Sequence, residues 1–328
     1  MKICIVGAGA IGGLCAGWLG SRLPPGDVEL SALARGATLA ALRSDGLQLH
    51  SGSDTARVSL HASDDPRTLG PQDLVVVAVK GPALAGVAPA VSQLLGPNTV
   101  VLVTMNGVPW WFFDGLGGVC DGLRLESVDP GGVVRDAIPL RHVIGCVVHA
   151  SSAVERPGVV RHVMGNGLII GEPVGGASER VAGLAGLLTR AGFAVTVSER
   201  IQRDIWFKLW GNMTMNPVSA LTGATADRVL DDPLVRGFCC AVMEEAKVIG
   251  ERIGCAIDQT PQQRHEITRK LGAFKTSMLQ DVEAGRPLEI DALVGAVREI
   301  GLHLQLATPN IDALLGLVRL MARMRGLA

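Results

Sequence analysis

Three polar residues recur at intervals of four in the segment WFKLWGNMTMNP, namely Lys208, Asn212 and Asn216. A helix turns by about 100° per residue, so steps of four drift by only about 40° and the three side chains share one face. A cation and two amides on one face, bordered by Trp and Met, can hold a carboxylate and a carbonyl. Taken alone, the same pattern fits a solvated polar stripe equally well.

A second chemical signal lies at the N-terminus, where Gly7-Ala8-Gly9-Ala10-Ile11-Gly12 follows the short β-rich stretch Lys2–Val6. This glycine spacing is typical of a loop that cradles a dinucleotide pyrophosphate. The first glycine makes the tight turn, the second lets the backbone approach the phosphates, and the third lets a helix pack on the strand. Phosphates bind at the start of that helix, where free N–H groups and the helix dipole favour negative charge.

The same N-terminus also has the composition of a secretory leader, with one positive charge followed by a long uncharged stretch of small residues. Six glycines (7, 9, 12, 13, 17 and 20) argue against a leader helix. Each glycine costs a helix about 1 kcal/mol relative to alanine. A strand, a glycine turn and a helix give the glycines defined places, so we favour a dinucleotide site.

Composition narrows the class of protein. The 328 residues include 30 basic and 31 acidic residues, a net charge of −1 that implies no nucleic-acid partner. Seven cysteines without a C-x-x-C pair suit reduced thiols in a cytoplasm better than disulfides or a zinc site. Apolar runs such as 74–79 are too short to span a bilayer. We expect a cytoplasmic protein without a metal site or membrane span.

The expected second strand, 28–34, indicates which dinucleotide binds. Sites for NAD or FAD usually place an acid at the end of this strand, where it accepts hydrogen bonds from the ribose. Glu29 lies at the start of the strand, too early to reach the ribose, whereas Arg35 follows its end. A guanidinium suits a 2′-phosphate, so we predict NADP(H) rather than NAD(H). The arginine could instead be an ordinary surface residue.

The remaining pattern is that of an open α/β sheet followed by helices. Near-continuous apolar or β-rich runs predict strands at 73–79, 99–104, 143–148 and 193–197, and a hairpin over 158–171 that turns at residues 165–167. From about residue 198 the apolar spacing predicts helices at 199–214, 233–253, 262–284, 288–304 and 309–324.

We therefore predict an α/β protein with an N-terminal Rossmann-type, doubly wound sheet over residues 1–198 and an all-helical substrate and catalytic domain over 199–328. A longer loop at 109–141 belongs to the first domain, and the cleft between the domains is the expected substrate site. No Tyr is present, which excludes a Tyr-x-x-x-Lys catalytic pair. Glu289, considered alone, is a first-turn acid that complements a helix dipole.

Together these residues resemble a known family, the ketopantoate reductases (2-dehydropantoate 2-reductases). The resemblance covers nearly the whole chain: the glycine loop, Ala-Arg-Gly after the second strand, Lys80 after strand 73–79, and Asn-Gly after strand 99–104. It continues through the Lys-x-x-x-Asn-x-x-x-Asn-Pro helix, and Ser-Met-Leu-Gln-Asp followed by Glu-Ile-Asp.

The resemblance implies NADPH-dependent reduction of ketopantoate to (R)-pantoate, as in pantothenate and coenzyme A biosynthesis, and it implies residue roles. Lys208 is the proton donor to the ketone oxygen and Glu289 closes the site near cofactor and substrate. Substrate is held by Asn212, Asn216 and Ser277, with Asn106 between substrate and nicotinamide ribose. Arg35 and Lys80 belong to the ribose-phosphate end, and the backbone near Ala150 lines the cofactor. The implied partner is a small 2-oxo acid; a homodimer stays open.

Segment 109–141 is longer than the connection expected for compact family members and contains Trp110-Trp111-Phe112-Phe113. We expect these aromatics to be buried. We favour a position in which these aromatic side chains cover the substrate cleft. They could instead pack in a core beneath the sheet edge or lie at a subunit interface. The segment leaves open a bulkier 2-oxo acid as substrate. A non-catalytic NADP(H)-sensing protein also stays open, whereas Arg35 disfavours a flavin protein.

Overall fold

The computed structural model describes all 328 residues, which group into two compact units. The first unit comprises residues 1–105 and 132–201, and the second comprises residues 106–131 and 202–328. This grouping differs from the expected division at residue 198, because residues 106–131 pack with the helices of the second unit. No helix is long and apolar enough to cross a membrane.

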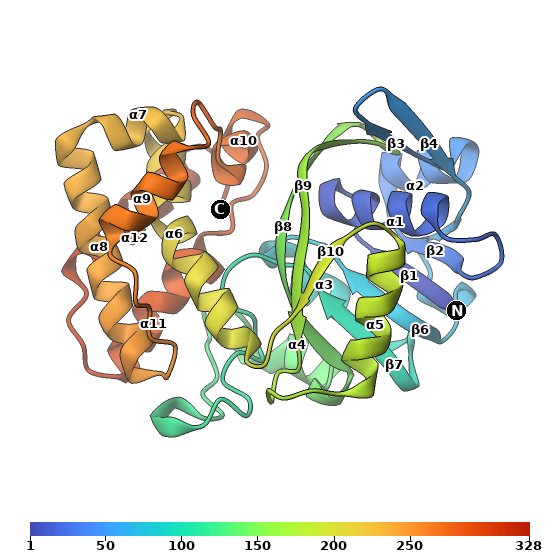
Figure 1. Cartoon of the computed structure of the whole chain (residues 1–328), viewed down its shortest axis with the longest axis horizontal. Helices are drawn as coiled ribbons and strands as arrows, with labels where there is room; N and C mark the ends of the chain where they lie inside the picture. The colour runs from blue at the N-terminus through green and yellow to red at the C-terminus, as the bar shows by residue number, and fades with distance from the viewer. The chain divides into compact units, whose positions relative to one another are not determined.

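The first unit is built on one ten-stranded sheet with the order β4-β3-β9-β8-β7-β6-β1-β2-β5, and β10 pairs with β9 (Figure 1). Strand β1 is parallel to both β2 and β6, so the carboxyl ends of these three strands meet at one edge. The predicted Rossmann-type sheet is confirmed. The strands are β1 (Lys2–Val6), β2 (Glu29–Leu33), β3 (Leu47–Ser51), β4 (Asp54–Val58), β5 (His61–Ser63), β6 (Gln72–Val77), β7 (Leu95–Val103), β8 (Val143–Arg156), β9 (Val159–Gly171) and β10 (Ala194–Val197).

Glycines let the first helix approach the sheet closely. Cβ atoms added at Gly17 and Gly20 would lie 2.6 Å from the Leu49 side chain and 2.3 Å from that of Val58. The glycines that would weaken an isolated helix therefore permit α1 to pack on β3 and β4. The helices of this unit are α1 (Ala10–Arg22), α2 (Gly36–Asp45), α3 (Gly81–Ser92), α4 (Val133–Ala137) and α5 (Glu179–Arg190).

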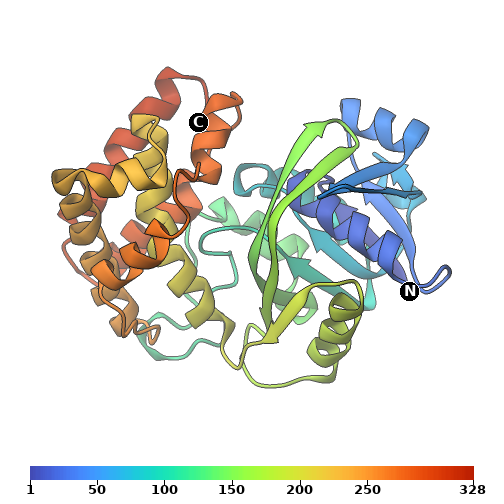
Figure 2. The same ribbon diagram turned by 45° about the horizontal axis from the view of Figure 1, so that its top comes forward.

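The predicted hairpin at 158–171 is wrong. Strand β9 is continuous over these residues and pairs antiparallel with β8, forming the long green ribbon in Figure 1 and Figure 2. Gly165 has φ +71°, and an added Cβ would lie 2.5 Å from the carbonyl oxygen of His149. The glycine thus serves an irregularity within the ladder, a bulge rather than a chain reversal. Strands β3, β4 and β5 were not predicted.

The second unit is helical, as predicted. Helix α6 buries Trp206, Trp210 and Met213, and the Trp210 Nε1 donates a hydrogen bond to the carbonyl oxygen of Met243 at 2.7 Å, which ties α6 to α8. Its helices are α6 (Ile201–Thr222), α7 (Ala226–Asp231), α8 (Pro233–Arg252), α9 (Pro261–Arg269), α10 (Ser277–Glu283), α11 (Ala296–His303) and α12 (Pro309–Met324), with a π-helical turn at Asp291–Gly295.

Two predicted helix boundaries are wrong in this unit. Helix α6 continues beyond residue 214 through Pro217 to Thr222. The predicted helix 262–284 is two helices, α9 and α10, because the chain leaves helical geometry at Gly272 (φ +62°) and starts again after Thr276, whose hydroxyl caps α10. Helices α8 and α12 agree with prediction to within one residue.

The four adjacent aromatic residues form part of the core of the second unit. Trp110, Trp111, Phe112 and Phe113 are all at most 4% exposed, and the Phe112 ring lies 6.1 Å from that of Trp206 on α6. The predicted burial is confirmed. Side chains this deeply buried present no surface that could cover a substrate. The predicted position over the substrate cleft is therefore wrong.

Candidate functional site

One face of α6 carries the polar residues singled out by their spacing. The Lys208 Nζ donates a hydrogen bond to the Asn106 Oδ1 at 2.9 Å, and the Asn216 Nδ2 donates to the Ser277 Oγ at 3.4 Å. Lys208 and Asn216 are eight residues apart, a rise of about 12 Å along the helix, with Asn212 between them. The structure thus brings four of the predicted substrate residues into two pairs along one helix face.

Burial explains how α6 presents this face. Trp206 and Trp210 anchor the opposite side in the core, while Lys208 and Asn212 remain partly exposed. Asn216 is 5% exposed, and a buried amide needs a hydrogen-bond partner, which Ser277 supplies from the first turn of α10. These features do not fit a solvated polar stripe.

Glu289 is buried just before the π-helical turn, with an exposed fraction of 7%. An acid that merely complements a helix dipole lies at the surface, where water solvates its charge. Burying a carboxylate costs free energy unless other groups compensate it, and such groups concentrate at functional sites. Its burial favours a functional role over the first-turn interpretation.

These side chains can bind and protonate a 2-oxo acid. Amide and hydroxyl groups can hold a carboxylate, and an ammonium can stabilise the alkoxide that forms when a ketone is reduced. The same ammonium can transfer a proton to that oxygen. The second unit therefore contains a polar face and an ammonium group with the chemistry that this reaction needs, and binding and proton donation by these residues stay predictions.

The glycine loop between β1 and α1 has the geometry that its spacing predicts. Gly7 adopts φ +91° at the tight turn. A Cβ at Gly12 would lie 2.1 Å from the Gly7 carbonyl oxygen, so α1 packs directly on the turn. A Cβ at Gly9 would meet nothing within 4 Å, which leaves open space beside the backbone. No side chain caps the start of α1, so its first N–H groups can face an anion.

The other predicted cofactor residues of this unit follow neighbouring strands. Arg35 is the N-cap of α2, after β2, and Lys80 is the N-cap of α3, after β6. Both therefore lie at the edge that carries residues 7–12. In β8 the register shifts between His149 and Ser151, so the peptide groups of Ala150 lie outside the regular ladder. Binding of the cofactor by these residues stays a prediction.

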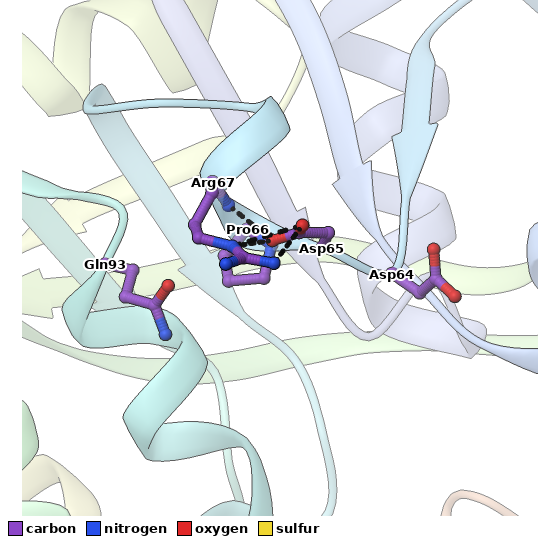
Figure 3. Close-up of a pocket in the computed structure, with 5 residues that line it drawn as sticks. All are labelled: Asp64, Asp65, Pro66, Arg67 and Gln93. Carbon is purple, nitrogen blue, oxygen red and sulfur yellow. Dashed lines mark hydrogen bonds and ion pairs between the residues drawn. The ribbon is translucent and has the colours of Figure 1, made fainter.

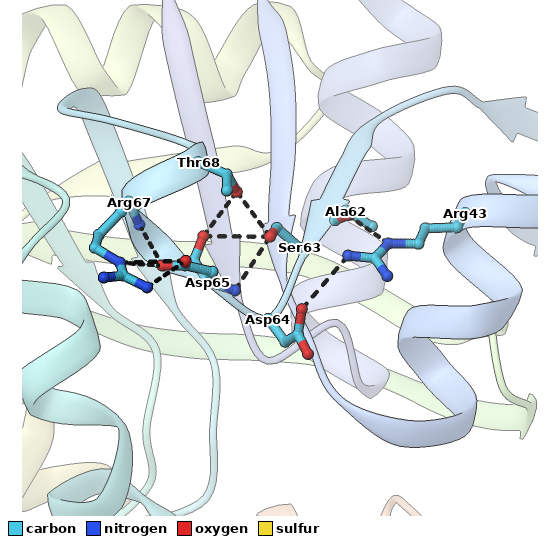
Figure 4. Close-up of polar contacts among 7 residues, drawn as sticks. All are labelled: Arg43, Ala62, Ser63, Asp64, Asp65, Arg67 and Thr68. Atoms are coloured by element: carbon cyan, nitrogen blue, oxygen red, sulfur yellow. Dashed lines mark hydrogen bonds and ion pairs between the residues drawn. The ribbon is translucent and has the colours of Figure 1, made fainter.

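Acids near Arg35 are paired with other arginines. Strand β5 is parallel to β2, and the loop after it carries Asp64 and Asp65. Asp64 pairs with Arg43 at 3.4 Å and Asp65 pairs with Arg67 at 2.8 Å (Figure 4). Hydrogen bonds from Arg67 hold the pKa of Asp65 below its ordinary value. Arg35 is exposed and has no ion pair, so its guanidinium is available to a ligand.

Two surface cavities are lined by residues other than the predicted site residues. One of about 470 Å³ is lined by Asp64, Asp65, Pro66, Arg67 and Gln93 (Figure 3), and one of about 510 Å³ is lined by residues of α8 and α9 that include Cys240 and His265. Neither contains a residue predicted to bind substrate or cofactor.

The sequence alone assigned no role to Gly107, which packs closely against Ala292.

Two glycine substitutions should separate binding from folding in the loop. Gly9→Ala is expected to leave the melting temperature unchanged and to weaken dinucleotide binding roughly tenfold to a hundredfold, because the new methyl displaces phosphates from backbone N–H groups. Gly12→Ala is expected to destabilise the fold by about 1–3 kcal/mol through overpacking. Thermal melts and dinucleotide titrations measure both effects. Equal melting temperatures and equal affinities for the two variants would contradict the assignment of phosphate binding to Gly9 and helix packing to Gly12.

Comparison with known proteins supports the family that the residues resemble. The models described as "Ketopantoate reductase PanE/ApbA" and "Ketopantoate reductase PanE/ApbA C terminal" match residues 3–110 and 200–322. A 2-dehydropantoate 2-reductase of Mesorhizobium japonicum is 44% identical over 99% of both chains.

Solved structures give the same result. A proposed ketopantoate reductase from Ralstonia solanacearum MolK2 is 58% identical, with a TM-score of 0.95 over 99% of both chains. A PanE/ApbA family ketopantoate reductase from Ralstonia eutropha JMP134 is 26% identical, with a TM-score of 0.83, and the match covers 99% of this chain and 100% of that one. The chain therefore belongs to the ketopantoate reductase family of nicotinamide-dependent oxidoreductases.

Proposed function

We propose that this chain reduces the 2-oxo group of 2-dehydropantoate (ketopantoate) to give (R)-pantoate, with NADPH as the reductant. Family membership supports the reaction class. The observation that carries the proposal is the 2.9 Å hydrogen bond from Lys208 to Asn106, on the same face of α6 as the Asn216–Ser277 pair. A proton donor and a polar binding face are what reduction of a 2-oxo acid requires.

The dinucleotide, when bound, supplies a hydride to the 2-oxo carbon. Open space at Gly9 and uncapped N–H groups at the start of α1 fit its pyrophosphate. The Asn106 amide oxygen orients the Lys208 ammonium, which stabilises the negative charge on the former ketone oxygen and protonates it. A guanidinium in its place keeps its proton at neutral pH.

The amides of Asn212 and Asn216 and the Ser277 hydroxyl would hold the substrate carboxylate and the remaining polar groups. The Asn212 side chain is partly exposed and makes no hydrogen bond within the chain, so both ends of its amide are available to substrate. Glu289, buried at the end of its loop, completes the polar environment.

NADPH is proposed over NADH because Arg35 has no acidic partner. Arg35→Asp is expected to lower NADPH affinity roughly tenfold to a hundredfold, since a charge-assisted hydrogen bond to the 2′-phosphate is lost. NADH affinity should fall much less. The matched control is Arg57→Asp, the same charge reversal on β4 at the opposite end of the sheet order. Titrations with both cofactors measure the ratio, and full retention of the NADPH preference in Arg35→Asp would overturn this assignment.

An NADPH-oxidation assay with ketopantoate and a panel of branched 2-oxo acids tests the function. The highest kcat/KM is expected with ketopantoate. The longer segment 109–141 left a bulkier substrate open, and the burial of its four adjacent aromatics in the core weakens that alternative. A higher kcat/KM with another acid would reassign the substrate, and NADPH binding without turnover of any acid would favour a sensor.

A further inference from the structure

The residue that follows Asn106 in the chain packs tightly against the backbone of another segment. The next residue, Gly107, adopts φ +83° and lies against Ala292 in the π-helical turn. The backbone N–H of Val108 donates a hydrogen bond to the Ala292 carbonyl oxygen at 2.9 Å. The segment that follows β7 is thereby fixed to the residues that follow Glu289.

No side chain fits at position 107. An added Cβ would lie 2.4 Å from the Ala292 carbonyl oxygen, 2.6 Å from its carbonyl carbon and 2.8 Å from its Cβ. Two of these atoms are backbone, so no rotamer change relieves the clash. Any larger residue must move residues 106–108 away from the turn.

The turn itself is an unusual element. Residues 291–295 are π-helical, and the N–H of Ala296 bonds to the carbonyl oxygen of Asp291, five residues earlier. Such turns are rare and occur frequently at functional sites. Here the turn offers a carbonyl group to a second segment of the chain and begins two residues after the buried Glu289.

We propose that Gly107 is a positioning residue for proton transfer: its contact with Ala292 sets the backbone of Asn106 so that the amide oxygen meets the Lys208 ammonium. The inference rests on the proposed function of Lys208. Asn106 can move only slightly before this hydrogen bond is lost. The Lys208–Asn106 hydrogen bond is 2.9 Å long, and a displacement of about 1 Å takes such a bond out of range.

The test compares Gly107→Ala with Gly118→Ala. Both glycines follow β7 in the 106–131 segment and have positive φ, +83° and +72°, so both substitutions introduce similar backbone strain. At Gly118 an added Cβ meets nothing within 4 Å. The difference between the variants therefore reports the contact with Ala292 alone.

Gly107→Ala is expected to lower kcat by about 10- to 100-fold, the range associated with misplacement of a reacting group by about 1 Å. The alkaline limb of the kcat–pH profile should move to lower pH, because a hydrogen-bond acceptor favours the charged ammonium and its loss lowers the pKa of the proton donor. Gly118→Ala should behave as the native protein in kcat and in pH profile.

A double variant shows whether Gly107 acts through Asn106. Gly107→Ala with Asn106→Ala is expected to be no slower than Asn106→Ala alone, because both changes remove the same hydrogen bond. Additive losses, or a loss of kcat with an unmoved alkaline limb, would overturn the proposal. Ala292→Val, which crowds Gly107 from the opposite side, provides the same pH readout if Gly107→Ala does not fold.

These outcomes are separable from failure of the proposed function. If the native chain reduces no 2-oxo acid, the function itself is refuted. If the native chain is active and Gly107→Ala matches Gly118→Ala in both kcat and pH profile, only the positioning role of Gly107 is refuted.

Discussion

Lys208→Ala is expected to lower kcat by on the order of 10²–10⁴ while the variant folds normally and binds NADPH with unchanged affinity. The loss follows from the position of the Lys208 Nζ, which lies 2.9 Å from the Asn106 amide oxygen on the polar face of α6. Alanine there leaves the alkoxide without a stabilising cation and without a proton donor. Steady-state kinetics with the best 2-oxo acid and an NADPH titration measure the two quantities.

Two comparisons sharpen this result. Lys270→Ala removes the same side chain from an exposed position just after α9 and should leave kcat unchanged. Lys208→Arg keeps the positive charge but not a transferable proton, so it should recover substrate binding more than turnover. A near-native kcat with a raised KM in Lys208→Ala would identify Lys208 as a substrate anchor rather than an acid.

The glycine loop of the first unit was predictable because its signal is local. Strand β1, the glycine turn and the start of α1 occupy consecutive residues, and each glycine has a distinct steric reason within that segment. Gly7 makes the turn, Gly9 leaves open space and Gly12 permits close packing, as the spacing alone predicts. The position of Arg35 after β2 follows from the same local logic.

The polar face of α6 was also predictable, but its partners were not predictable from spacing. Helical periodicity alone places Lys208, Asn212 and Asn216 together. The bonds to Asn106 and Ser277 join residues 102 and 61 positions apart, and no periodicity reports such separations. Only the resemblance to a family indicated that these residues gather.

Errors in the predicted fold have the same origin. The residues around Gly165 allow a turn and so predict one, whereas β8 pairs with β9 through that position and requires a bulge. Likewise, the composition of Trp110–Phe113 predicts burial, but only the packing of Phe112 on Trp206 shows which core receives it. Composition indicates that side chains are buried, and long-range contacts decide where.

Trp111→Ala is expected to lower the free energy of unfolding by about 3–5 kcal/mol, the range for removing a large aromatic side chain from a packed core. Trp111 is 1% exposed in the second unit, so the substitution leaves a cavity. Denaturant unfolding measures the loss. At a temperature where the variant remains folded, the ranking of 2-oxo acids by kcat/KM should be unchanged, because the side chain is buried in the core.

Tryptophan-to-phenylalanine variants separate packing from hydrogen bonding in this core. The Trp111 Nε1 is buried without a hydrogen-bond partner, so Trp111→Phe removes volume without breaking a hydrogen bond. The Trp210 Nε1 donates to the Met243 carbonyl oxygen, so Trp210→Phe should cost about 0.5–1.5 kcal/mol more, because that hydrogen bond is lost while the carbonyl keeps its place in α8. A changed substrate ranking in Trp111→Ala with an unchanged free energy of unfolding would instead place the aromatic cluster over the substrate.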